Sequence, residues 1–156
     1  MPFTIQYEFD QRFNVPAKQA YEWATDYSPG DLALMGEKGR REIERIDERT
    51  VILTETTSKD GKRMKKRKLV KLNPERLSWT NTHLSGRTIY SQFLYEIIPE
   101  GKSSSRLHFT GLQLEYSDVS PKGMASALRK EDSRAWKLLA KAMEEEISSK
   151  KNKKGS

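Results

Sequence analysis

The stretch VPAKQAYEWATDYSPGDLALMGEKG, residues 15–39, interrupts a chain whose other segments mostly have the pattern of strands. Pro16 suits the first turn of a helix, where its missing N–H costs nothing. The apolar residues that follow have the i, i+3, i+4, i+7 spacing of an amphipathic helix: Ala20, Trp23, Ala24 and Tyr27. This spacing predicts a helix of about three turns.

A second, shorter helix is expected directly after the first. Within SPGD, Ser28 can cap a helix and Pro29 can occupy its first position. One apolar turn then precedes Gly36, formed by Leu32, Leu34 and Met35. Two short helices therefore separate the first strand from the rest of the chain.

The segments on both sides of these helices have the pattern of strands. In residues 3–15 the odd positions are mostly apolar and the even ones mostly polar, as in a strand with one buried face. After Gly39, β-branched and aromatic residues are frequent and turn sequences separate six expected strands. These strands are 40–46, 50–57, 63–72, 77–84, 88–98 and 106–119. The short links predict an antiparallel meander.

A long amphipathic helix is expected after Ser120 and Pro121. Its inner stripe consists of Leu128, Asp132, Trp136, Leu139, Met143 and Ile147. Residues 150–156 contain no apolar side chain, so a basic disordered tail is predicted there. The expected fold is α+β: a curved antiparallel β-sheet wrapped around a long C-terminal α-helix, in one domain over residues 1–149. This arrangement is called the helix grip.

Composition excludes several classes of site. The 156 residues include no cysteine, which excludes disulfides, thiolate nucleophiles, Cys-ligated zinc and iron–sulfur clusters, and suits a cytoplasmic protein. No apolar run could span a membrane, and the N-terminus does not resemble a signal peptide. The common catalytic and phosphate-binding motifs are absent. We therefore expect no metal and no cofactor.

The chain resembles the SRPBCC superfamily, which includes START-type lipid-transfer, polyketide cyclase/dehydrase and birch-pollen-allergen-like domains. The resemblance covers residues 3–147. It rests on FNVPAKQAYEWATDYSPGDLALMG, LVKLNPERLSWTN, YEIIPEGKSSSRLHFTG and the terminal helix. It implies a cavity between the sheet and the long helix for an apolar or amphipathic ligand. It also implies that Tyr27, Leu32 and Met35 flank the entrance.

Further candidate ligand-binding residues lie on the expected strands and on the long helix. They are Trp79, His83, Phe93, Tyr95, Phe109, Asp132 and Trp136. The aromatic rings either contact a ligand or fill the core, and Trp136 is expected to pack. His83 shares a strand face with Trp79 and either binds or exchanges a proton, or is structural or solvent-exposed. Asp132 needs a partner if it is buried, and otherwise lies at the edge of the stripe beside Lys or Arg.

A second hypothesis concerns KRMKKRKLVK, residues 62–71, which carries seven positive charges of a chain whose net charge is +7. Lys150 and three further lysines form a second basic segment, so the rest of the chain is mildly acidic. The candidate anion-binding residues are Lys62, Arg63, Lys65, Lys66, Arg67 and Lys68. With cations at odd and even positions, both faces of this strand end are expected to be solvated. The hairpin then either contacts nucleic acid or an anionic membrane, or protects a sheet edge from aggregation.

The sequence thus predicts binding or transport of a small hydrophobic or amphipathic ligand, lipid-like or polyketide-like, by a monomer or weak dimer. We expect a binding protein rather than an enzyme. The alternative is a cyclase or dehydratase that uses isolated cavity residues, namely His83, Tyr95, Asp132 and Glu55. Weak contact with nucleic acid or an anionic surface, through the basic hairpin, is a further alternative. A module that contacts other proteins is a third class.

Overall fold

The structure is a computed structural model that describes residues 2–28, 30–116 and 118–154, without the side chains of residues 59 and 152–154. Its strands are β1 Phe3–Phe13, β2 Gly39–Asp47, β3 Thr50–Lys59, β4 Lys62–Asn73, β5 Ser78–His83, β6 Gln92–Pro99 and β7 Ser105–Glu115. Its helices are α1 Ala17–Ala24, α2 Asp31–Leu34, a 3-10 turn Pro74–Arg76 and α3 Met124–Lys154. The described part of the chain contains no helix with the length and apolar character needed to cross a bilayer.

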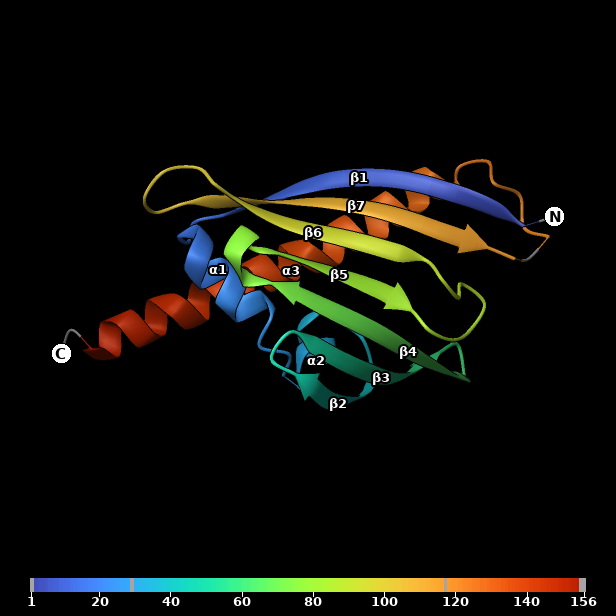
Figure 1. Ribbon diagram of the computed structural model, residues 1–156, viewed down its shortest axis with the longest axis horizontal. Helices are drawn as coiled ribbons and strands as arrows, with labels where there is room; N and C mark the ends of the chain where they lie inside the picture. The colour runs from blue at the N-terminus through green and yellow to red at the C-terminus, as the bar shows by residue number, and fades with distance from the viewer. Residues whose placement is uncertain (1, 29, 117, 155–156) are drawn as a thin grey trace.

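The seven strands form one curved antiparallel sheet in the order β1-β7-β6-β5-β4-β3-β2 (Figure 1). The predicted meander from β2 to β7 is confirmed. The first strand pairs with the last, from Phe3 opposite Glu115 to Phe13 opposite Ser105. The odd positions of β1 face the core, as its alternation predicted, and Phe13 is fully buried. The predicted helix-grip fold is therefore confirmed.

The long helix α3 covers the concave face of the sheet and lies behind it in Figure 1. Trp136 contacts three rings of the sheet, with ring centroids 6.2 Å from Phe13, 6.4 Å from Trp79 and 5.9 Å from Tyr95. Ala140 and Met143 are buried in the same core. The predicted inner stripe of the helix thus forms one wall of the core.

Several predicted boundaries differ in the structure: the strands expected at 88–98 and 106–119 are Gln92–Pro99 and Ser105–Glu115. The first helix ends at Ala24 because the backbone leaves helical geometry at its C-cap, Thr25, and reaches a left-handed φ of 46° at Tyr27. At the other end of the chain, α3 continues through Lys154, where a disordered tail was expected from residue 150. In Figure 1 this end of α3 extends beyond the sheet. Pro29 and residues 155–156, which belong to the expected cap and tail, lie outside the described residues.

Candidate functional site: a cavity between the sheet and helix α3

A cavity of about 110 Å³ lies between the concave face of the sheet and α3. The sheet contributes Arg41, Leu53, Lys68, Trp79, Asn81 and Tyr95 to its wall. The segment formed by α1, α2 and their connection contributes Trp23, Ala24, Tyr27, Asp31 and Met35, and α3 contributes Trp136 and Leu139. The two short helices thus form one side of the cavity.

Five of the ten predicted ligand-binding residues line this cavity: Tyr27, Met35, Trp79, Tyr95 and Trp136. Leu32 is buried but is not part of the wall. The other four are not part of the wall either: His83, Phe93, Phe109 and Asp132. Phe93 and Phe109 belong to the buried core, which is the alternative that the sequence left open. That the five wall residues contact a ligand stays a prediction.

The aromatic side of the cavity is built by neighbouring strands. Trp79 on β5 and Tyr95 on β6 are cross-strand partners whose rings stack with centroids 4.8 Å apart and an interplanar angle of 1°. Behind them, Phe109 meets the Tyr95 ring edge-on at 5.1 Å. Burial raises the pKa of Tyr95 well above its ordinary value, so its hydroxyl keeps its proton. The rings therefore offer a flat, well-packed apolar surface with one hydroxyl.

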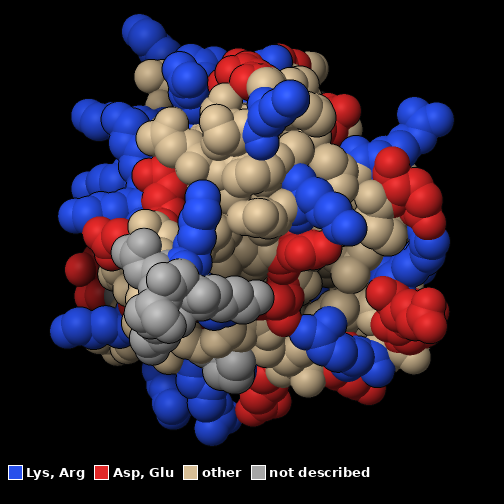
Figure 2. Space-filling model, turned by 90° about the vertical axis from the view of Figure 1, so that its left-hand side faces the viewer, with Lys and Arg blue, Asp and Glu red and all other residues tan. Residues whose placement is uncertain are grey.

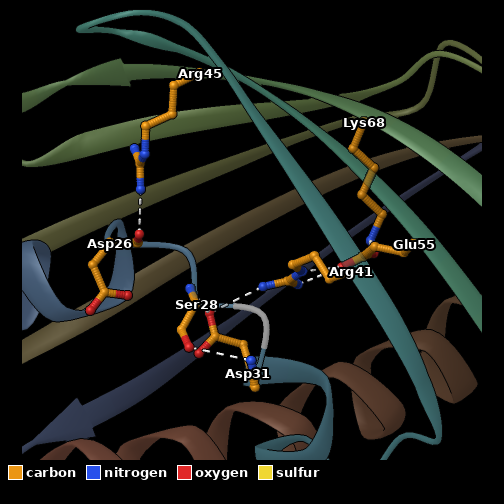
Figure 3. A network of polar contacts seen from close by, with 8 residues as sticks. Asp26, Ser28, Asp31, Arg41, Arg45, Glu55 and Lys68 are labelled. Carbon is orange, nitrogen blue, oxygen red and sulfur yellow. Dashed lines mark hydrogen bonds and ion pairs between the residues drawn. The ribbon is translucent and has the colours of Figure 1, made fainter.

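The polar side of the cavity is a four-residue ion-pair network, Asp31–Arg41–Glu55–Lys68 (Figure 3). Arg41 Nε donates to Glu55 Oε2 over 2.7 Å, and its Nη1 donates to Asp31 Oδ2 over 3.1 Å. Lys68 Nζ lies 2.5 Å from Glu55 Oε1. Burial tends to raise the pKa of Glu55, but Lys68 and Arg41 outweigh it and hold this pKa below its ordinary value. The network contains two cations and two carboxylates.

Two arginines of β2 bond to the segment formed by the α1–α2 connection and α2 (Figure 3). Arg45 donates to the Asp26 carbonyl over 2.5 Å, and Arg41 pairs with Asp31. Arg41 also lies over the Tyr27 ring, 5.7 Å from its centroid. Burial raises the pKa of Asp31, and Arg41 opposes this effect. This side of the cavity is therefore held by a few polar contacts together with the buried side chain of Leu32.

Comparison with known proteins adds the fold relationship. No family model and no curated protein matches this sequence. Among solved structures, the Zhui aromatase/cyclase from Streptomyces superposes with a TM-score of 0.70 at 12% identity, over 94% of each chain. Norcoclaurine synthase from Thalictrum flavum superposes with a TM-score of 0.69 at 15% identity, over 92% of this chain and 88% of that chain. A START superfamily protein from Mycobacterium smegmatis superposes with a TM-score of 0.68 at 15% identity, over 92% and 97%.

The chain has the SRPBCC fold. At these identities the likeness concerns the fold alone, and it confirms the resemblance found in the sequence. The cavity described above lies in the helix grip of this SRPBCC fold, with the short helices at its side. That these helices flank an entrance stays a prediction.

A second polar cluster of the SRPBCC fold lies outside the cavity wall, around Asp132. The Tyr7 hydroxyl donates to Asp132 Oδ2 over 2.5 Å, so the half-buried carboxylate has a hydrogen-bond partner. Burial raises the pKa of Asp132, and the Tyr7 hydrogen bond opposes this effect. The Tyr7 ring packs closely against Gly111, where an added Cβ would lie only 2.6 Å from the ring. Asp132 therefore has a hydrogen-bond partner on β1.

His83 is buried on the concave face of β5. Its Nδ1 lies 2.9 Å from the Thr88 hydroxyl, and its ring contacts Phe93 at 4.9 Å. Burial, together with the positive charges of Lys68 and Lys66, lowers the pKa of His83 to about 3. The imidazole is therefore neutral at pH 7, and the structural reading of this histidine is favoured.

The expectation that both faces of the basic strand end, in residues 62–71, are solvated is wrong. The six predicted anion-binding residues do not form one solvated cluster, because Lys66 and Lys68 point to the concave side and are half-buried, and Lys68 is paired with Glu55. The other four are exposed: Lys62, Arg63, Lys65 and Arg67. β4 is also not an edge strand, since it lies between β3 and β5. Its register with β5 begins at Lys68, so the hairpin tip pairs only with β3.

Four polar or charged wall residues were not among the sequence-predicted ligand contacts: Asp31, Arg41, Asn81 and Lys68. Lys68 was predicted only as an anion-binding surface residue. Arg41 shares its strand face with Ile43, and Asn81 shares its face with Trp79, so alternation alone could have placed both on the concave side. No local signal indicates that Asp31 meets Arg41. Within the described residues, no group of three His, Cys, Asp or Glu side chains could hold a metal ion.

Proposed function

We propose that the protein binds a small amphipathic molecule in the cavity between the sheet and α3. The observation that carries this proposal is the pairing of a stacked aromatic wall, Trp79 and Tyr95, with an ion-pair network on the opposite strands of the same cavity. Mostly apolar walls with a few convergent polar groups are the usual form of a ligand site. We place this binding in the cytoplasm, in line with the absence of cysteine.

The size of the cavity limits the ligand. An engineered protein cavity of about 150 Å³ holds benzene, so the smaller volume of about 110 Å³ limits the ligand to no more than one small ring. A lipid-like or polyketide-like ligand requires the segment around α2 to move outward. Such a movement breaks the contacts of Arg41 and Arg45 with this segment and exposes the buried side chain of Leu32.

The first test is native mass spectrometry of protein purified gently from its own organism, followed by solvent extraction. We expect a co-purifying small molecule that is lost from Tyr95→Ala and Trp136→Ala. The matched control is Tyr90→Ala, which removes an exposed ring in the β5–β6 connection. Circular dichroism verifies that each variant is folded. A retained molecule that survives both cavity substitutions in folded protein would contradict the proposal.

The enzymatic alternative, a cyclase or dehydratase, has less support from the site. Of its four candidate groups only Tyr95 lines the cavity, while Glu55 is paired with two cations and Asp132 with Tyr7. We therefore propose binding rather than turnover. Conversion of the extracted molecule on prolonged incubation with the protein would overturn this choice.

The exposed cations of the hairpin favour a second candidate function, contact with nucleic acid. In the described part of the chain no ion pair involves Lys62, Arg63, Lys65 or Arg67. Figure 2 shows that basic and acidic side chains are interspersed at another end of the molecule, around an uncharged central area. Unpaired cations in one hairpin can release counterions from a polyanion.

The test of this second function is binding of a labelled oligonucleotide at increasing salt. We expect the affinity to fall with salt, and to fall further when the four hairpin cations are replaced by Gln. The control with the same change in net charge replaces Lys18, Lys102, Lys122 and Lys130, which are exposed elsewhere. If the two variants lose oligonucleotide affinity equally, the effect is one of net charge alone, and a binding site on the hairpin is excluded.

A further inference from the structure

Asn81 places an amide without a partner in the wall of the cavity. The residue is 8% exposed and lies on the concave face of β5 between Trp79 and His83. Its Oδ1 is buried, and the structure gives it no hydrogen bond from any described residue. Buried amide oxygens are nearly always hydrogen-bonded, because desolvation without a partner is unfavourable. Because Asn81 also lines the cavity, a molecule bound there can supply the missing donor once the amide turns toward it.

Lys68 places additional donors beside this acceptor. Lys68 is the register partner of His83, and Val70 is the partner of Asn81, so Lys68 and Asn81 are diagonal neighbours on one face. The Lys68 side chain is 20% exposed, and its ammonium is paired with Glu55 alone among the described residues. An ammonium has three donors, so it can also donate to a ligand oxygen.

The charges around the cavity favour a neutral ligand. Arg41 and Lys68 are balanced by Glu55 and Asp31, so either sign of ligand charge would have to displace a member of the network. A neutral group that carries one donor and one acceptor in a plane matches the amide of Asn81, as adenine does when Asn reads it in DNA. A secondary amide in a ring has this donor–acceptor edge.

We propose that the cavity binds a planar lactam of about one ring, seated against Trp79 and Trp136, with its N–H donating to Asn81 Oδ1. The lactam carbonyl accepts from the Asn81 amide or from Lys68. This inference rests on the proposed function, since it names the ligand class for the same cavity. The single-ring limit follows from the volume of about 110 Å³.

A pair of probes isolates the proposed hydrogen bond: 2-pyridone, and 1-methyl-2-pyridone, in which a methyl group replaces the N–H. Isothermal titration calorimetry of the folded protein is expected to show 2-pyridone binding about tenfold or more tightly than its methylated analogue. Asn81→Ala removes the amide and leaves room for the methyl group, so both probes should then bind equally. Thr82→Val, on the opposite face of the same strand, should retain the wild-type ratio.

Two further probes separate the failure of this inference from the failure of the proposed function. Toluene tests the apolar wall alone, and benzoate tests a charged ring of similar size. Equal affinities of the two pyridones for wild-type protein, an unchanged ratio in Asn81→Ala, or tighter binding of benzoate would overturn the lactam inference and leave a ring-binding cavity. If none of the four probes binds folded protein at millimolar concentration, both the inference and the cavity function are wrong.

Discussion

The hydroxyl of Tyr7 donates to Asp132 Oδ2 over 2.5 Å and joins the first strand to the last helix, 125 residues apart in the sequence. Burial raises the pKa of both groups, and the charge of Asp132 raises that of Tyr7 further. Lys66 and Lys68 oppose the shift at Asp132, while Glu131 adds to it. The contact therefore helps to hold α3 on the concave face, although it removes the charged carboxylate of Asp132 partly from water.

Tyr7→Phe removes the donor and leaves the half-buried carboxylate of Asp132 without this hydrogen bond. We expect the free energy of unfolding to fall by about 1.5–3 kcal/mol at pH 7, the usual range for a hydrogen bond to a charged group. Urea denaturation measures the change. Tyr116→Phe, at an exposed position, is the control and should stay within about 0.5 kcal/mol of wild type. A similar loss in both variants would show that the Tyr7–Asp132 contact has no special role.

Asp132→Asn keeps an acceptor for Tyr7 and removes the buried charge. Because the folded state raises the pKa of Asp132, it binds this proton more tightly than the unfolded chain does. Wild-type stability is then highest below the unfolded pKa of about 3.9 and declines as pH rises through the folded value. The variant should therefore melt at a higher temperature than wild type at pH 7, with no such advantage at pH 3. A variant that is less stable at pH 7 would mean that Lys66 and Lys68 outweigh the desolvation.

His83 should make the protein sensitive to mild acid. Its pKa is about 3 when folded and about 6.5 when unfolded, so its neutral form stabilises the fold fully above pH 6.5. This contribution is lost as pH falls toward 3, at about 1.4 kcal/mol per pH unit. Denaturation at pH 6 and pH 5, in a His108→Gln background that removes the other imidazole, should show this slope. A His83 imidazole resonance that titrates between pH 8 and pH 5 would contradict it.

Gly111→Ala should destabilise the protein through Tyr7. The added Cβ would lie 2.6 Å from Tyr7 Cε1, so the ring has to shift within a packed core. We expect a loss of about 1–3 kcal/mol in the free energy of unfolding. Gly30→Ala is the control, since its Cβ meets nothing closer than 3.7 Å and should be tolerated. Equal stabilities would indicate that the Tyr7 ring has room to move.

Asp31→Asn should loosen the segment around α2 without unfolding the domain. The substitution weakens the ion pair with Arg41 and leaves the Arg41–Glu55 pair intact. Amide exchange of residues 32–37 should accelerate, while the free energy of unfolding changes by less than about 1 kcal/mol. Asp60→Asn, in the exposed turn of the β3–β4 hairpin, is the matched control.

Arg41→Met provides the contrast, because it removes a partner of the buried Glu55. Breaking one side of a buried ion pair costs about 3–5 kcal/mol, so this variant should be destabilised globally. For Asp31→Asn, amide exchange that accelerates equally over the whole chain, rather than in residues 32–37, would show that α2 does not open separately.

The main error of sequence interpretation concerns Lys66 and Lys68. A strand places alternate residues on opposite faces, so a run of cations on both faces predicts that both are solvated. In the structure β4 is an interior strand whose concave side faces α3, and Glu55 compensates Lys68 there. The compensating charge lies on another strand, so the cation run by itself could not indicate it.

The sequence alone determined the seven strands, the two short helices, the terminal helix and their combination into a helix grip. These features follow from side-chain periodicity and turn residues, which are local properties of the chain. Only the tertiary structure decided that Asp31 meets Arg41, that Asp132 meets Tyr7, and that Asn81 faces a cavity without a partner. The reason is that sheet register and curvature bring distant residues together, and the packing of their rings sets the volume that remains between them.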